Sequence, residues 1–149
     1  MLIKYIRDLR HIRDKQKGAS ESVERGFMKN KRTLGAFYEQ RVSDYLEQKG
    51  YRIIERNFYC RFGEIDLICR KNGYLVFVEV KYRSSDSFGT PSAAVDFRKQ
   101  IRISNTASYY LYCYHYPMDT ACRFDVAAVS EQSVQLIENA FPYRGCFRG

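Results

Sequence analysis

The chain has 149 residues, enough for one domain with a single hydrophobic core and too few for two substantial domains. Hydrophobic residues make up 45% of it and charged residues 28%, which excludes a disordered or fibrous protein. The formal net charge of +8 at pH 7 attracts polyanions, of which nucleic acid is the commonest large one.

Cysteine usage and hydropathy exclude two further classes of protein. The five cysteines form no close Cys-x-x-Cys pair, and an odd number cannot all pair within the chain. No apolar run approaches the roughly 20 residues that span a bilayer, and the first residues lack the apolar core of a secretory signal. We therefore expect a cytoplasmic protein with reduced thiols, no structural zinc site and no membrane partner.

The beginning of the chain differs in composition from the rest, because it is dense in lysine and arginine. We predict a basic N-terminal extension over residues 1–32, one folded domain over 33–142 and a short tail over 143–149. Leu2, Ile6 and Leu9 recur at helical spacing. The extension is therefore either a short amphipathic helix or, as its charge favours, a loose basic tail.

The folded part is predicted to begin with a helix over 34–49. Apolar residues recur there at helical spacing, and Gly50 stands where a glycine commonly ends a helix. Residues 51–58 are rich in β-branched and aromatic side chains, which predicts a strand.

A β-hairpin is predicted next. Two apolar, β-branched segments, 64–70 and 74–83, are separated by Asn72-Gly73. This dipeptide best fits the two positive-φ positions of a type I′ turn, so the loop should contain two residues.

A second helix and two strands are predicted after the hairpin. Thr90 and Pro91 have the chemistry of an N-cap and a first-turn proline, so the helix is expected to begin there and to end before Pro117. Its predicted buried face consists of Ala94, Phe97, Ile101, Ser104, Ala107 and Leu111. Strands are predicted over 123–129 and 134–137.

Both strands of the hairpin carry charges among apolar residues. Glu64 and Asp66 lie in the first strand, and Glu79 and Lys81 lie in the second. A buried carboxylate is costly unless it is paired or bound to a metal.

The hairpin register brings these charges together. With a two-residue loop Asp66 lies opposite Glu79, and opposed Cβ atoms are about 4.5 to 5.5 Å apart on one face. Two carboxylates so placed share a proton or hold a cation. Lys81 projects to the same face as Glu79 and lies opposite Glu64.

Two other interpretations of the acids remain open. The acids and the lysine can face solvent on a half-exposed sheet, where each ion pair contributes at most about 1 kcal/mol. They can also be the acid and base of a glycosidase, with carboxyl groups about 5 to 9.5 Å apart around a sugar. The opposed acid pair argues against the first, and the positive charge against the second.

Asp66 followed by Glu79-Val80-Lys81 resembles the PD-(D/E)XK signature of restriction-endonuclease-like nucleases. Four longer segments carry a closer resemblance, to the YraN family of small bacterial proteins predicted to be nucleases. These segments are Gly-Glu-Ile-Asp-Leu-Ile at 63–68, Val-Phe-Val-Glu-Val-Lys-Tyr-Arg at 76–83, Gly-Thr-Pro at 89–91 and Arg-Phe-Asp-Val at 123–126.

The resemblance implies an α/β fold with a restriction-endonuclease-like core. Its order is helix-strand-strand-strand-helix-strand, with a mixed sheet flanked by helices, and it would occupy residues 33–142.

The resemblance also implies a metal-dependent endonuclease that uses Mg²⁺, with Mn²⁺ as a substitute. Its metal ligands would be Asp66, Glu79, the Val80 carbonyl and Glu39, and Lys81 would act in catalysis. Glu39 is implied because related nucleases carry a glutamate on the first helix, one turn after a glycine such as Gly35. The family often has a second glycine where this chain has Tyr38.

Nucleic acid, DNA in preference to RNA, is the partner that charge and resemblance together imply. The position of Lys99-Gln100 resembles one that such nucleases direct at the scissile bond. Basic residues that would hold phosphates are Arg83, Arg98, Lys99 and Arg102, with Gln100 beside them. A solvated helix face is the alternative for these positions, and a non-catalytic nucleic-acid-binding module is the alternative for the whole protein.

Overall fold

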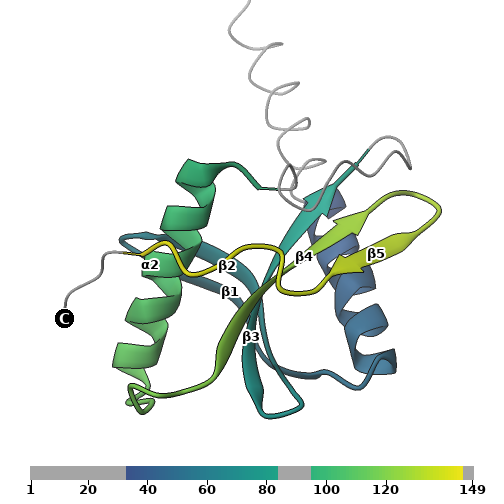
Figure 1. The fold of residues 1–149 in the computed structure, drawn as a ribbon. Helices are drawn as coiled ribbons and strands as arrows, with labels where there is room; N and C mark the ends of the chain where they lie inside the picture. The colour runs from purple at the N-terminus through teal and green to yellow at the C-terminus, as the bar shows by residue number, and fades with distance from the viewer. Residues whose placement is uncertain (1–32, 84–94, 146–149) are drawn as a thin grey trace, which may run out of the picture. The chain divides into compact units, whose positions relative to one another are not determined.

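The computed structural model describes residues 33–83 and 95–145 (Figure 1). The chain divides into two units, residues 1–37 and 38–149, and the elements below belong to the second unit except for the first turn of the first helix. The boundary predicted between residues 32 and 33 stays a prediction. The elements are a helix over 33–48, β1 (Arg52–Cys60), β2 (Gly63–Lys71), β3 (Tyr74–Tyr82), α2 (Phe97–Cys113), β4 (Cys122–Val129) and β5 (Val134–Ile137).

The five strands form one mixed sheet in the order β1-β2-β3-β4-β5. All neighbours are antiparallel except β3 and β4, which are parallel. Parallel neighbours need a crossover, and α2 lies in the chain between them. The predicted α/β class, mixed sheet and helix-strand-strand-strand-helix-strand order are confirmed, and β5 adds an antiparallel edge.

Two hydrophobic clusters cover opposite faces of the sheet, each beneath one helix (Figure 1). The α2 cluster contains Ile103, Ala107 and Tyr110 of the helix, together with residues of β2, β3 and β4. The second cluster contains Val42 and Leu46 of helix 33–48, packed on the other face of the same strands. Cover on both faces explains the unbroken apolar run Leu-Val-Phe-Val at 75–78 of β3, whose side chains belong alternately to the two clusters.

The hairpin between β2 and β3 has the predicted turn. Asn72 and Gly73 have φ values of 50° and 83°, as a type I′ turn requires, and Lys71 pairs with Tyr74. The register predicted from the sequence is therefore confirmed as far as the pairing of Leu67 with Val78.

The predicted start of the second helix is wrong. Thr90 and Pro91 lie outside the described residues, but Val95 and Asp96 are not helical and α2 begins at Phe97. Asp96 is the N-cap, since its Oδ1 accepts a hydrogen bond of 2.9 Å from the Lys99 main-chain N–H.

The predicted buried face of this helix is correct only in part. Ser104 and Ala107 are buried, whereas Phe97 is 58% exposed. The buried face consists of Gln100, Ile103, Ser104, Thr106, Ala107 and Tyr110. Neither helix in 33–83 and 95–145 combines the length and apolarity needed to span a membrane.

Candidate active site

The strands β2 and β3 separate at the acids. Their pairing ends at Leu67 and Val78, so Asp66 and Glu79 occupy the next position of the register, beyond the last pair. There the Val80 main-chain N–H donates a hydrogen bond of 2.7 Å to Asp66 Oδ2. A side chain of β2 thus satisfies a main-chain donor of β3 where the ladder ends.

The regular alternation of side chains along β2 is broken at Asp66. Ile65 belongs to the α2 cluster, Leu67 to the opposite cluster and Ile68 to the α2 cluster again. On β1, Asn57 lies opposite Asp66, because its neighbours pair with Ile65 and Leu67, and its φ is 53°. This irregularity gives the Asp66 carboxylate a position that strict alternation does not provide.

Glu79 projects to the α2 side of the sheet. Phe77, two residues earlier, lies in the α2 cluster. From α2, Lys99 places Nζ 3.0 Å from Glu79 Oε1, and the Glu79 side chain is only 13% exposed. The other oxygen, Oε2, is buried and has no hydrogen-bond partner among the described residues. Half of this carboxylate is therefore unsatisfied.

Burial and mutual repulsion shift the acidity of both acids. Burial, followed by the charge of Glu79, raises the pKa of Asp66 to about 7, against the opposing effects of the Val80 N–H and Lys99. Burial also raises the pKa of Glu79, opposed first by Lys99 and more weakly by Lys81. At neutral pH the pair is poised to keep a proton or to accept a cation.

Lys81 lies on β3 two residues beyond Glu79, so it projects toward the same face. The positive charge of Lys81 is close enough to lower the pKa of Glu79. The negative charge of Glu64 is close enough to raise the pKa of Glu79. The structure therefore brings together Asp66, Glu79 and Lys81, and adds Lys99 from α2.

Glu39 is not gathered with the other acids. It lies on helix 33–48, which covers the face of the sheet opposite to α2 and Glu79. Its negative charge raises the pKa of Asp66, but less strongly than burial and the charge of Glu79 do. Within 33–83 and 95–145 no three His, Cys, Asp or Glu side chains form a group able to hold a metal ion. The predicted three-carboxylate set is thus not preassembled.

The acid pair nevertheless fits a divalent cation. Asp66 and Glu79 offer hard carboxylate oxygens, which Mg²⁺ prefers. The buried, unpartnered Glu79 Oε2 is an acceptor that still lacks a ligand. The Lys99 ammonium beside Oε1 shows that the site attracts positive charge.

The predicted nucleic-acid contacts fall into different environments. Arg98 and Arg102 are exposed on α2. Lys99 forms an ion pair with Glu79. Arg83 follows the end of β3, and its main-chain N–H donates a hydrogen bond to Val129 O. Gln100 is a correction, because its side chain is buried and its Nε2 donates to Val95 O at 2.9 Å. Gln100 lies on the side of α2 that packs on the sheet, because the helix begins after the Asp96 cap.

The family model described as "Uncharacterised protein family UPF0102" matches residues 38–129. The chain belongs to the UPF0102 family. The matched range contains the acid pair, both lysines and α2, and the resemblance to the YraN family is confirmed.

Similar proteins from other bacteria carry the same family name. A UPF0102 protein of Lachnoclostridium phytofermentans is 48% identical over 116 residues, which cover 78% of this chain and 98% of the relative. One of Syntrophus aciditrophicus is 48% identical over 111 residues, covering 72% and 87%. The solved "Crystal structure of SSO0001" aligns over 71% of this chain and 50% of its own, with 17% identity and a TM-score of 0.39.

A buried polar network in this UPF0102 domain could not be recognised from the sequence. Asp125 of β4 is fully buried, and its carboxylate accepts hydrogen bonds from the Arg123 guanidinium at 3.0 Å and the Asn139 N–H at 2.9 Å. Tyr51 donates to Glu138 Oε1 at 2.9 Å and contacts Arg123. The Arg-Phe-Asp-Val segment thus ties β4 to the start of β1 and to the segment after β5. Its charges serve the fold.

Gly63, the first residue of the Gly-Glu-Ile-Asp segment, allows β2 to approach α2. Its φ is +148°, which side-chain-bearing residues rarely adopt, and a Cβ there would lie 3.3 Å from Thr106 Oγ1. The same Cβ would lie 3.7 Å from Arg102 Nε. The glycine therefore sets the helix against the strand that carries Asp66.

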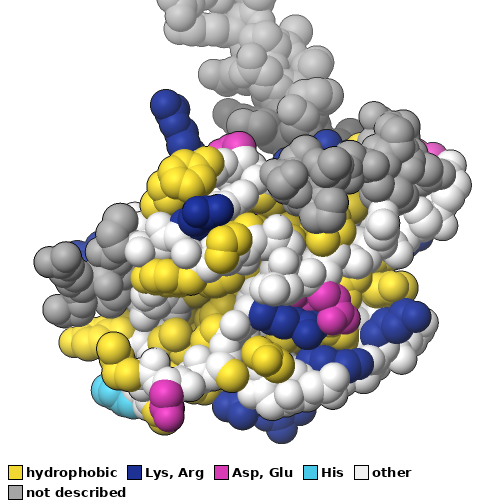
Figure 2. All heavy atoms as spheres, viewed as in Figure 1, with side chains coloured by type: hydrophobic (Ala, Val, Ile, Leu, Met, Phe, Trp, Pro, Cys, Tyr) yellow, Lys and Arg dark blue, Asp and Glu magenta, His cyan; other side chains and the backbone are white. Residues whose placement is uncertain are grey.

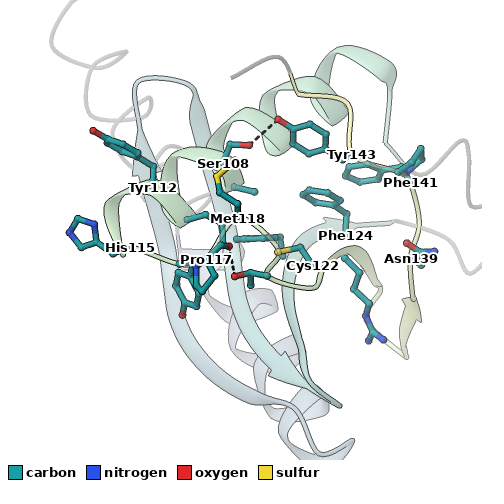
Figure 3. A pocket seen from close by; sticks show the side chains of 17 residues that line it. Ser108, Tyr112, His115, Pro117, Met118, Cys122, Phe124, Asn139, Phe141 and Tyr143 are labelled. Carbon is teal, nitrogen blue, oxygen red and sulfur yellow. Dashed lines mark hydrogen bonds between the residues drawn. The ribbon is translucent and has the colours of Figure 1, made fainter. Parts of the chain in front are cut away.

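A cavity of about 710 Å³ lies away from the acid pair, between the second half of α2 and the segment around residues 139–143 (Figure 3). Neither acid nor either lysine lines it. Figure 2 shows many hydrophobic and few acidic side chains on this face. Its walls include Tyr112, His115 and Tyr116, whereas Tyr110 of α2 is buried in the α2 cluster.

Proposed function

We propose that this UPF0102 protein is a metal-dependent endonuclease that hydrolyses phosphodiester bonds in nucleic acid, with DNA as the favoured substrate. The observation that carries the proposal is the pair of half-buried acids where β2 and β3 separate. Their pKa values are raised by burial, and two lysine charges lie beside them. Carboxyl groups whose pKa values are perturbed in this way cluster at functional sites.

Each residue of the site has a role in this proposal. Asp66, Glu79 and the Val80 carbonyl would hold Mg²⁺ or Mn²⁺, and Glu39 would reach the site only if its helix or side chain moved. The cation supplies positive charge to the phosphoryl oxygen and makes water a stronger acid. Lys81 would orient the attacking water or stabilise the charge that develops on the phosphate.

Basic side chains would position the substrate without reading its sequence. Arg98 and Arg102 are exposed on α2, and Arg83 follows β3 at the end where the acids lie. Arginine binds phosphate oxygens through charge-assisted hydrogen bonds, which give affinity and orientation. Gln100 is not included, because it is buried.

A specific observation favours a second function, a non-catalytic nucleic-acid-binding module. Lys99 already neutralises Glu79, as it would in a degenerate site that no longer binds metal. The two functions differ in whether a divalent cation can enter.

The deciding experiment is a cleavage assay with Mg²⁺ or Mn²⁺ on linear, branched and single-stranded DNA and RNA. Glu79→Gln is the matched control, because it preserves shape and removes the charge. We expect cleavage by the wild type and its loss in Glu79→Gln. Nucleic-acid binding without cleavage of any substrate, in both proteins alike, would favour the binding module.

A further inference from the structure

One ammonium group serves both acids of the candidate site. Lys99 Nζ lies 3.0 Å from Glu79 Oε1, and its charge lowers the pKa of Asp66 as well as that of Glu79. A cation that stabilises two adjacent carboxylates occupies the electrostatic place that a divalent metal ion would take.

The stability of α2 does not explain why a lysine stands at position 99. The residue lies in the first turn, where its main-chain N–H is used by the Asp96 cap. The N-terminal end of a helix carries partial positive charge, so a cation there is unfavourable. Beyond the capping carboxylate of Asp96, the first turn of α2 contains no acidic residue. The interaction that favours Lys99 at this place is the one with Glu79.

The contact between Lys99 and Glu79 is built to be exchanged. The Lys99 side chain is 30% exposed, against 13% for Glu79, so the lysine can move into solvent and the acid cannot. A lysine makes a point contact from a flexible stem, unlike the paired hydrogen bonds of arginine. Glu79 Oε2 stays without a hydrogen-bond partner in the described residues. Lys99 therefore satisfies only half of the carboxylate.

We propose that Lys99 is an exchangeable counter-ion of the acid pair. It balances Asp66 and Glu79 while no divalent cation is bound, and it gives way when one binds. The displaced ammonium is then available to a phosphate group of the nucleic acid. Metal and lysine thus compete for the same carboxylate, which couples metal entry to substrate binding. This inference rests on the proposed function.

Competition is tested by titrating the full-length protein with Mn²⁺ and following free Mn²⁺ by electron paramagnetic resonance. Lys99→Met removes the competing charge and should tighten Mn²⁺ binding by about two- to tenfold, the range expected for one partly exposed ion pair. Lys99→Arg should weaken it, because a guanidinium can engage both oxygens of Glu79. Arg52→Met, exposed at the start of β1, controls for the loss of one positive charge and should leave the affinity unchanged.

With Glu79→Gln added, the five proteins separate failure of this inference from failure of the proposed function. Equal Mn²⁺ affinity in wild type, Lys99→Met and Lys99→Arg, together with weaker binding by Glu79→Gln, would overturn the competition and leave the metal site standing. No Mn²⁺ binding by the wild type or by either Lys99 variant would overturn both. If Lys99→Met does not fold, the opposite shift in Lys99→Arg decides the question.

Discussion

The Val80 main-chain N–H hydrogen-bonds to Asp66 Oδ2 at 2.7 Å, in the space where β2 and β3 part. The bond fixes one oxygen of the Asp66 carboxylate. It is therefore the contact through which the fold orients the first acid of the candidate site relative to Glu79-Val80-Lys81.

Metal-free stability should depend on the ionisation of Asp66. Its pKa is about 7 in the folded protein and 3.8 in the reference state, so folding favours the protonated form. The stabilising contribution of the protonated acid is full below pH 4 and is lost as pH rises through 7. Asp66→Asn should therefore stabilise the metal-free protein at pH 8, by at most about 4 kcal/mol, and have little effect at pH 4. Urea unfolding in a chelator at both pH values measures this, and an equal effect at both would contradict it.

Lys81→Ala should abolish most cleavage and leave Mn²⁺ affinity largely intact, because the ammonium acts on water and phosphate and is not a ligand. Nucleic-acid affinity at fixed salt should fall only modestly. The slope of the logarithm of affinity against the logarithm of salt concentration should decrease by about one. Rates, metal titration and affinity at fixed salt are measured on the same preparations. Cleavage equal to that of the wild type would indicate a contaminating nuclease.

Gly63→Ala should lower the free energy of unfolding by about 1 to 3 kcal/mol, since the backbone is strained for any side chain and Thr106 Oγ1 is close. Gly35→Ala is the matched control, because a Cβ there meets nothing within 4 Å and alanine favours a helix. Chemical denaturation of both variants gives the comparison. A Gly63→Ala protein as stable as Gly35→Ala would show that β2 can withdraw from α2 at little cost.

Asp125→Ala should destabilise the fold by about 3 to 5 kcal/mol, because it leaves the Arg123 guanidinium and the Asn139 N–H without their buried acceptor. Glu138→Gln should cost much less, since the Glu138 side chain is 55% exposed. Thermal and urea melts of the pair measure the contrast. A small effect of Asp125→Ala would mean that water replaces the carboxylate.

Local chemistry allowed the hairpin and the acid pair to be predicted. Asn72-Gly73 determines the loop length, the loop length determines the register, and the register places Asp66 next to Glu79. The break in side-chain alternation at Asp66 was not predictable from the sequence. It depends on Asn57 of the neighbouring strand and on the packing of Ile65 and Leu67 into opposite hydrophobic clusters. The same limit applies to Lys99, whose partner is distant in the sequence.

The start of α2 and the polar network around Asp125 could not be predicted, for related reasons. Threonine and aspartate, the residues at positions 90 and 96, are both favoured at helix N-caps. Packing of α2 on the sheet selects Asp96. Arg123 and Asp125 looked like part of a motif, but their function in the fold appears only when Tyr51 and Glu138 are brought beside them.

The parallel pairing of β3 with β4 has a consequence for how the chain folds. The strands β1, β2 and β3 are joined by short turns and can form from neighbouring sequence, whereas β4 reaches β3 only after the whole of α2 has been passed. Closing so long a loop costs entropy before any contact repays it. We therefore expect the three-stranded meander to form early and the docking of β4 to limit the folding rate. Variants at the β4 network should then mainly slow folding, because β4 docks in the transition state, and mainly faster unfolding would contradict this.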